Sequence, residues 1–129
     1  MIVSIRPEEV LSFASNLIKA HASECLALTM HSSDDPLPEH YFALLGRKVE
    51  GGVRIRRIGF GDRQFFDVQR EIHLSHANYS FRFSDNEYKR MLLLDQSRLL
   101  FKTSDGIRYT EDRDTITKYV RYFTDCWRE

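Results

Sequence analysis

The sequence predicts an α/β fold in which a mixed, mostly parallel sheet is flanked by helices. Three observations lead to this prediction. Segments with helical and β-rich patterns alternate along the first half of the chain, three β-rich segments then follow in quick succession, and a strongly amphipathic segment ends the chain. With 129 residues the chain is about the size of one domain, so we expect residues 1–129 to form a single domain.

The first half of the chain carries clear helix signals. Pro7 suits the first position of a helix, and apolar residues recur after it at helical spacing. Gly51 and Gly52 supply the stop of a second helix. The predicted order is helix, strand, helix, strand and helix, over residues 7–20, 25–30, 39–50, 53–60 and 62–76.

The second half predicts three strands and a final helix. Residues 79–83 alternate with period two, and residues 91–95 are predicted as an apolar strand. Residues 98–103 follow after the two-residue link of Gln96 and Ser97, which suits a hairpin. Residues 112–127 show the strongest helical spacing in the chain, and Asp112 lies at their start. The apolar positions of this helix are Ile116, Tyr119, Val120, Phe123 and Trp127. We expect this stripe to pack inward, with a subunit interface as the alternative.

The composition indicates which partners and which cellular location to expect. Lys plus Arg (19) balance Asp plus Glu (19), whereas a dedicated nucleic-acid binder usually carries a basic excess, so nucleic acid is not indicated by net charge. No stretch reaches the ~18 apolar residues of a membrane span, and the N-terminus lacks a signal-peptide pattern. We therefore expect no membrane partner and a cytoplasmic location. Cys25 and Cys126 match no disulfide or C-x-x-C pattern and are expected to be free thiols.

Several features follow one another in the order found in the phospholipase D superfamily, which the chain resembles across residues 7–128. The pattern comprises the leading helix, an apolar strand, a helix that ends in Gly-Gly-Val-Arg-Ile, the third helix, the hairpin that starts with Met-Leu-Leu-Leu-Asp, and the closing helix. Each piece is common, so the shared order carries the resemblance. It implies the fold of a phospholipase D-like half-domain, and a homodimer, because active members assemble one site from two half-domains.

The signature of that superfamily is H-x-K-x-x-x-x-D, and the matching positions here are Tyr88, Arg90 and Asp95. The resemblance implies a His nucleophile, a Lys that binds phosphate and an Asp that supports the His. A guanidinium can replace the Lys as a phosphate contact. A phenol, with a reference pKa of about 10, is a poor substitute for imidazole at neutral pH. No catalytic residue is therefore assigned.

Downstream of the Asp the superfamily often has a Ser, and here the hydroxyl of Thr103 fits that position. The predicted ligand-binding set is thus Tyr88, Arg90, Asp95 and Thr103. The alternative is a strand whose outward residues are polar, with Asp95 opening the hairpin.

Two further groups are candidates for binding. Arg54 and Arg56 could bind an anion or a nucleic-acid backbone, together with the nearby Arg47, Lys48 and Arg57, or could be solvated strand residues. His73 and His76 are three residues apart and could share a metal, with Asp67 or Glu71 as a further ligand. No third ligand has diagnostic spacing, so surface histidines are the simpler interpretation and no metal site is predicted.

The leading hypothesis is a non-catalytic ligand-binding or regulatory module. It is similar to the effector-sensing domains attached to some prokaryotic transcription regulators, and we expect it to bind a small anionic ligand or a protein partner without a cofactor. No DNA-binding segment precedes residue 7, so we expect any such part to lie outside this sequence. One alternative is a phosphodiesterase or nuclease in which His73 or His76 replaces the nucleophile. Another is a protein-interaction scaffold.

Overall fold

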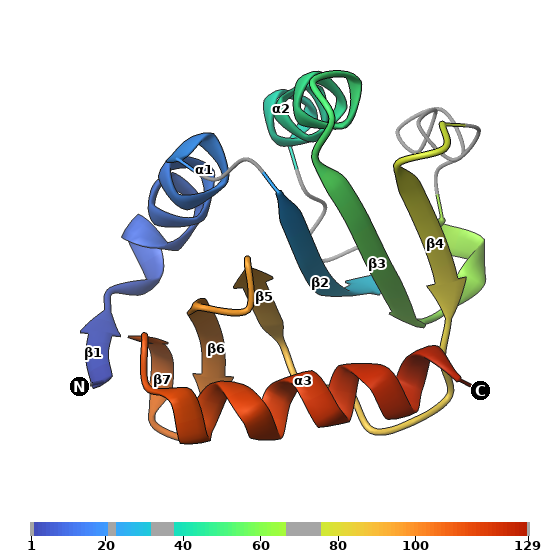
Figure 1. Ribbon diagram of the computed structural model, residues 1–129. Coiled ribbons are helices and arrows are strands. Elements are labelled where there is room, and N and C mark those ends of the chain that lie inside the picture. The colour runs from blue at the N-terminus through green and yellow to red at the C-terminus, as the bar shows by residue number, and fades with distance from the viewer. Residues whose placement is uncertain (1, 21–22, 32–37, 67–75, 129) are drawn as a thin grey trace.

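The computed structural model describes residues 2–20, 23–31, 38–66 and 76–128, which form a sheet with helices on both faces (Figure 1). The strands are β1 (Ile2–Ile5), β2 (Glu24–His31), β3 (Arg54–Gly61), β4 (Tyr79–Phe83), β5 (Met91–Leu94), β6 (Arg98–Thr103) and β7 (Gly106–Thr110). The helices are α1 (Val10–Ala20), α2 (Glu39–Glu50) and α3 (Arg113–Trp127), with short 3-10 turns at Pro7–Glu9 and Arg63–Phe65.

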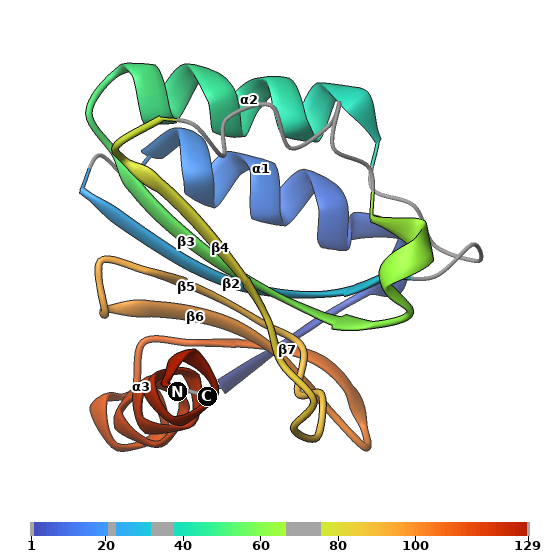
Figure 2. The same ribbon diagram turned by 90° about the vertical axis from the view of Figure 1, so that its right-hand side faces the viewer.

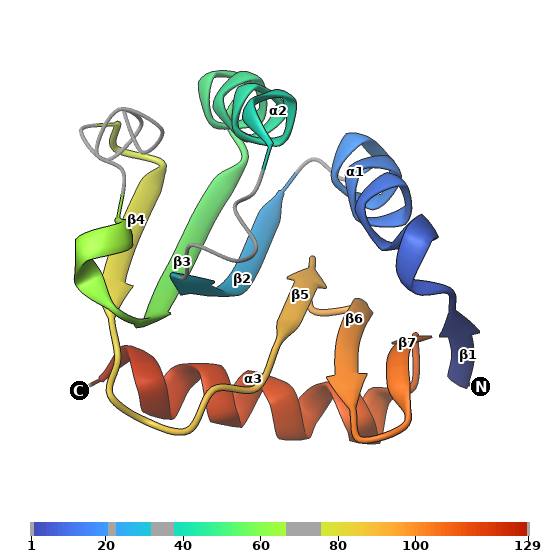
Figure 3. The ribbon, with the colours of Figure 1, turned by 180° about the vertical axis from the view of Figure 1, so that it is seen from behind.

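The sheet has seven strands in the order β1-β7-β6-β5-β2-β3-β4. Helices α1 and α2 lie on one face and α3 crosses the other (Figure 2). Figure 3 shows α3 running beneath the sheet from the β7 side to the β4 side. The predicted α/β fold with a mixed sheet flanked by helices is therefore confirmed.

The expectation that the sheet is mostly parallel is wrong. Only the β2–β3 and β3–β4 pairs are parallel, and the other four pairs are antiparallel. Tight turns join β5 to β6 and β6 to β7, and strands joined in this way pair in the antiparallel sense. The other two antiparallel pairs, β2–β5 and β1–β7, join strands that are distant in sequence. Strands β1 and β7 extend the antiparallel half of the sheet and were not predicted.

Each face of the sheet has its own apolar core. On β5, Leu92 and Leu94 belong to the core beneath α1 and α2, whereas Met91 and Leu93 belong to the core beneath α3. Because successive side chains of a strand point to opposite faces, a strand covered on both faces is apolar throughout. The wholly apolar run over residues 91–94 is thereby explained.

The predicted helices differ in outcome. The helices over residues 7–20, 39–50 and 112–127 are confirmed, and the Asp112 carboxylate caps α3 by accepting the Thr115 N–H at 3.0 Å. The predicted third helix begins instead as the 3-10 turn Arg63–Phe65, and residues 67–75 lie outside the described residues. No helix in the described ranges is long and apolar enough to span a membrane.

The two cysteines are free and buried, as predicted. Cys25 belongs to the core beneath α1 and α2, and Cys126 belongs to the core beneath α3, so the sheet separates them. Burial is the largest influence on Cys25 and raises the pKa of its thiol to about 12. This thiol is therefore uncharged at neutral pH and acts as a small apolar side chain.

Candidate ligand-binding site

Arg90 and Thr103 lie at the edge of the sheet where β2 and β3 end. Strand β5 is antiparallel to β2, so the residues just before β5 lie beside the C-terminal end of β2. Strand β6 returns to the same edge, where the Lys102 N–H donates to the Arg90 carbonyl oxygen at 3.1 Å. We call this edge, with Tyr88, Arg90 and Thr103, the Arg90 edge.

Tyr88 lies in the loop between β4 and β5 and is half-buried. The centroid of its ring is 5.3 Å from that of Phe60, near the end of β3, and the ring packs against the core beneath α3. The aromatic ring therefore anchors the loop to the sheet.

Arg90 is half-buried and lies two and four residues before Leu92 and Leu94, whose side chains face α1 and α2. Since side chains two residues apart on a strand point to the same face, Arg90 faces the same side. Tyr41 of α2 lies on that face, and burial is the main cause that raises the pKa of its phenol. The positive charge of Arg90 is among the influences that oppose this rise. Tyr88 and Arg90 thus share an edge but act on opposite faces of the sheet.

Thr103 closes the hairpin between β6 and β7. Its hydroxyl donates to the Gly106 carbonyl oxygen at 3.2 Å and accepts the Asp105 N–H, also at 3.2 Å. Gly106 has a φ of 122°, a region that favours glycine, so this turn depends on it. These bonds give the hydroxyl a structural function in the turn.

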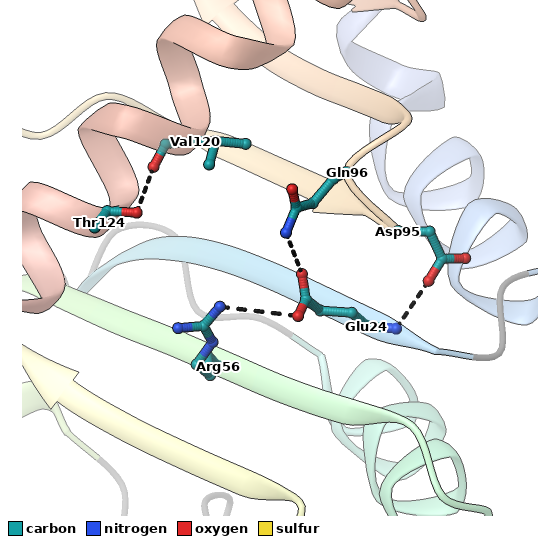
Figure 4. A network of polar contacts seen from close by, with 6 residues as sticks. All are labelled: Glu24, Arg56, Asp95, Gln96, Val120 and Thr124. Atoms are coloured by element: carbon teal, nitrogen blue, oxygen red, sulfur yellow. Dashed lines mark hydrogen bonds and ion pairs between the residues drawn. The ribbon is translucent and has the colours of Figure 1, made fainter.

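Asp95 lies at the other end of β5, away from the Arg90 edge. Its Oδ1 accepts the Glu24 N–H at 2.9 Å (Figure 4), and its own N–H donates to the Glu24 carbonyl oxygen at 3.0 Å. Five residues of extended chain separate it from Arg90, roughly 16 Å. The structure therefore brings Tyr88, Arg90 and Thr103 to one edge and leaves Asp95 at the opposite one.

Arg54 and Arg56 project from β3 toward the α3 side. Arg56 forms an ion pair with Glu24, with 3.8 Å between Nη2 and Oε2 (Figure 4), and its guanidinium lies over the ring of Phe123 at 5.5 Å. Arg54 lies two residues before Arg56 on the same strand and is exposed. Both side chains thus lie on the face of the sheet that carries α3.

The other basic residues of the predicted group lie elsewhere. Arg47 and Lys48 belong to α2 on the opposite face of the sheet, and Lys48 donates to the Lys19 carbonyl oxygen at 2.8 Å. Arg57 is only 2% exposed, donates to the Tyr79 hydroxyl at 3.1 Å and lies over the Phe42 ring at 5.2 Å. The expectation that these three residues form one basic group with Arg54 and Arg56 is therefore wrong. Arg47 is exposed on the other face of the sheet, whereas Arg57 is buried and not solvated.

Arg82 was missed by the sequence analysis. It lies on β4, and its guanidinium is 4.4 Å from the ring centroid of Trp127 at the end of α3. The signal was present, because residues 79, 81 and 83 are aromatic and point to one face while Ser80 and Arg82 point to the other. Only the fold could bring Arg82 close to Arg56 and Trp127.

Sequence comparison finds no match among models of protein families or among curated proteins. Structural comparison does find matches. NucT from Helicobacter pylori superposes with a TM-score of 0.73 at 10% identity, over 99% of this chain and 94% of its own. Nuc from Salmonella typhimurium, a phospholipase D family member, gives a TM-score of 0.68 at 10% identity with the same coverage. The chain has a phospholipase D-like fold.

A third structural match is TrmBL2, an archaeal chromatin protein whose structure shows a novel mode of DNA binding. It superposes with a TM-score of 0.76 at 13% identity. The match covers all of this chain and 49% of TrmBL2, so this chain spans about half the length of that protein.

His76, which the sequence analysis considered as an alternative nucleophile, does not lie beside Tyr88 and Arg90. It precedes β4, which is parallel to β3, so it lies at the edge where β3 begins and not at the Arg90 edge. Its Nδ1 accepts the Asn78 N–H at 3.0 Å, which occupies one ring nitrogen. His73 lies outside the described residues. Within the ranges that the structure describes, no three His, Cys, Asp or Glu side chains form a cluster that could hold a metal ion.

Proposed function

We propose that this chain is a non-catalytic ligand-binding module with a regulatory function. The observation that carries the proposal is the setting of Tyr88, at the position that the resemblance assigns to the histidine nucleophile. Its ring packs against Phe60 and the core beneath α3. A phenol is also a weak nucleophile at neutral pH, because its reference pKa is about 10. Both facts favour packing over covalent phosphoryl transfer.

The ligand of this module is a small anion bound by Arg90. A guanidinium presents a planar set of donors that matches the oxygens of phosphate or carboxylate. Arg90 is half-buried at a sheet edge, where reduced solvation strengthens such a contact. Tyr88 and Thr103 border the same edge, whereas Asp95 contributes through the structure of the hairpin.

The module acts as a homodimer in the cytoplasm. Active proteins that this chain resembles assemble their site from two half-domains, which supports the dimer. Two buried free thiols fit a reducing compartment. The likeness to TrmBL2, an archaeal chromatin protein, supports a function in regulation.

The test measures thermal stability with and without inorganic phosphate or pyrophosphate. A ligand at 100 times its Kd stabilises the folded state by about 2.7 kcal/mol, and we expect this gain to be lost in Arg90→Ala. Arg113→Ala, a change at an exposed arginine on α3, is the matched control and should retain the gain. The mass of the purified protein by sedimentation equilibrium tests the dimer.

A second measurement tests the absence of catalysis. The protein is assayed against a generic phosphodiester without added metal, beside Tyr88→Phe, which keeps the ring but removes the hydroxyl. We expect no turnover. Turnover that is lost in Tyr88→Phe or Arg90→Ala would overturn the non-catalytic proposal, and stabilisation by phosphate that persists in Arg90→Ala would remove Arg90 from the binding site.

A further inference from the structure

Three arginines gather on the α3 side of the sheet, apart from the Arg90 edge. Arg54 and Arg56 come from β3, and Arg82 comes from the neighbouring β4. In the register of these strands Arg56 lies opposite Ser80, and Ile58 lies opposite Arg82. We call Arg54, Arg56, Ser80 and Arg82 the arginine surface.

Trp127 holds two of these arginines side by side. The guanidinium carbons of Arg56 and Arg82 are 5.6 and 4.4 Å from the centroid of its ring. Phe123 stacks on the same indole, with 5.8 Å between centroids and 15° between planes. Arg82 Nη1 also donates to the Trp127 carbonyl oxygen. The ring contacts engage the face of each guanidinium, so its remaining N–H donors at the rim stay available. Trp127 is therefore a positioning residue for Arg56 and Arg82.

The arginine surface keeps an excess of positive charge. Glu24 offsets Arg56 across 3.8 Å, a distance longer than a direct hydrogen bond, and the side chain of Arg56 remains 38% exposed. Arg54 and Arg82 are exposed. A chain with no net charge thus carries a local basic surface on one face.

We propose that the arginine surface binds the backbone phosphates of a DNA duplex. All three cations are arginines, whose forked donors match phosphate oxygens, and the exposed Ser80 adds a hydroxyl of the kind that contacts phosphates. Arg54 and Arg56 are two residues apart on β3, about 6.6 Å along the strand, and Arg82 of β4 lies opposite Ile58, the next position on this face. The three cations therefore form a row that suits a repeating anion.

This inference does not depend on the proposed anion site. Arg90 acts on the face that carries α1 and α2, whereas the arginine surface lies on the α3 face, so each can be disabled without the other. The three contacts also explain how a protein without a basic excess could bind DNA weakly and without sequence preference.

The test is the fluorescence anisotropy of a fluorescein-labelled DNA duplex, measured over a range of salt concentrations. Each neutralised phosphate contributes about −0.9 to the slope of log K against log salt, so three contacts predict about −2.7. Arg54→Gln should weaken binding on the order of tenfold at low salt and make the slope shallower by about 0.9. Arg82→Gln should do the same. Trp127 is the only tryptophan of the chain, so its fluorescence should change on binding.

The control is Arg113→Gln, an equal loss of charge at the first residue of α3, about 21 Å along the helix from Trp127. It should leave binding within about twofold of the wild type. Arg54 is exposed, so Arg54→Gln should keep the wild-type thermal stability and its result does not depend on folding.

Three outcomes would overturn the inference. The first is no binding at low salt, and the second is an equal loss in Arg113→Gln and Arg54→Gln. The third is displacement of the duplex by polyglutamate at equal charge concentration, which would indicate an acidic protein segment as the occupant. Arg90→Ala should leave duplex binding unchanged, so failure of the small-anion site and failure of the arginine surface are distinguishable.

Discussion

Asp95 matches the aspartate of the phospholipase D signature and also has a structural function. Its carboxylate accepts the Glu24 N–H, and its own N–H donates to the Glu24 carbonyl oxygen, so it joins the β5–β6 turn to the start of β2. Its φ of 52° lies in the left-handed region, which Asp tolerates better than most residues. The side chain and the backbone conformation both suit this position.

We predict that Asp95→Ala lowers the free energy of unfolding by about 1–2 kcal/mol, because the part-buried Glu24 N–H loses its acceptor. Asp95→Asn is the control, since an amide oxygen can still accept this bond and Asn also tolerates a positive φ. The measurement is urea denaturation followed by far-ultraviolet circular dichroism.

Binding of phosphate should be unchanged in Asp95→Ala at temperatures where the variant is folded. Loss of phosphate binding without loss of stability would contradict the structural function and return Asp95 to the ligand site.

At the scale of elements, α3 depends on its N-cap. The Thr115 N–H and, secondarily, the Thr115 hydroxyl donate to the Asp112 carboxylate and lower its pKa. A lowered pKa in the folded state means that the ionised form stabilises the fold above the ordinary pKa of Asp, and that this contribution is lost as the pH falls through the lowered value.

We therefore predict that the urea midpoint of unfolding is higher for the wild type than for Asp112→Asn at neutral pH. The midpoints of the two proteins should become equal below about pH 4. Asn keeps a capping oxygen but carries no charge, so the comparison isolates ionisation. A gap between the midpoints that stays constant down to acidic pH would show that ionisation of Asp112 does not contribute.

The elements with strong periodic signals could be predicted, and the weakly marked ones could not. Helix α2 was predicted at its observed bounds, because its apolar positions recur and two glycines follow it. Strand β1 has only four residues and runs into Pro7, and no strand was predicted over the five residues of β7. Both depend on partners distant in sequence, which periodicity alone does not reveal.

Turn chemistry caused a smaller error in the β5–β6 hairpin. The sequence favoured Gln96 and Ser97 as the link, but the central pair is Asp95 and Gln96, both with positive φ, and the Ser97 N–H donates to the Leu94 carbonyl oxygen at 3.1 Å. Turns of this kind usually carry Asn or Gly. The non-glycine pair is supported by the contacts of Asp95 and by the bond from Gln96 Nε2 to Glu24 Oε1, at 3.2 Å.

The candidate site was predictable only in part, because the sequence does not show which helix covers which face of a strand. Tyr88, Arg90 and Thr103 are distributed along the chain as the resemblance implies, and the antiparallel pairing of β5 and β6 brings them to one edge. The positions of Arg57 and Arg82 depend on which face of which strand is covered. The sequence carries the alternation of side chains but not the identity of the covering helix, so burial of Arg57 and contact of Arg82 with Trp127 required the fold.

At the scale of the whole molecule, one sheet separates two apolar cores. Among the described residues, the buried side chains beneath α1 and α2 and those beneath α3 form two separate clusters, and strands such as β5 carry members of both. Strand β5 is central to this arrangement, because it joins the antiparallel half of the sheet to the parallel half. If residues 1–129 form a single domain, damage to either core must be transmitted through these strands to the other.

Adjacent leucines of β5 test this expectation. Leu92 is 6% exposed in the core beneath α1 and α2, and Leu93 is 0% exposed in the core beneath α3. Each change to alanine should cost about 2–5 kcal/mol through the cavity that it leaves. Fluorescence of Trp127 reports on the α3 side, whereas far-ultraviolet circular dichroism reports on all elements.

For a single cooperative unit, both probes give the same urea midpoint and an unchanged slope in each variant, since either cavity lowers the stability of the whole domain. If Leu92→Ala shifted the dichroism transition and left the Trp127 transition at its wild-type midpoint, the two faces would unfold separately and the single-domain prediction would be wrong.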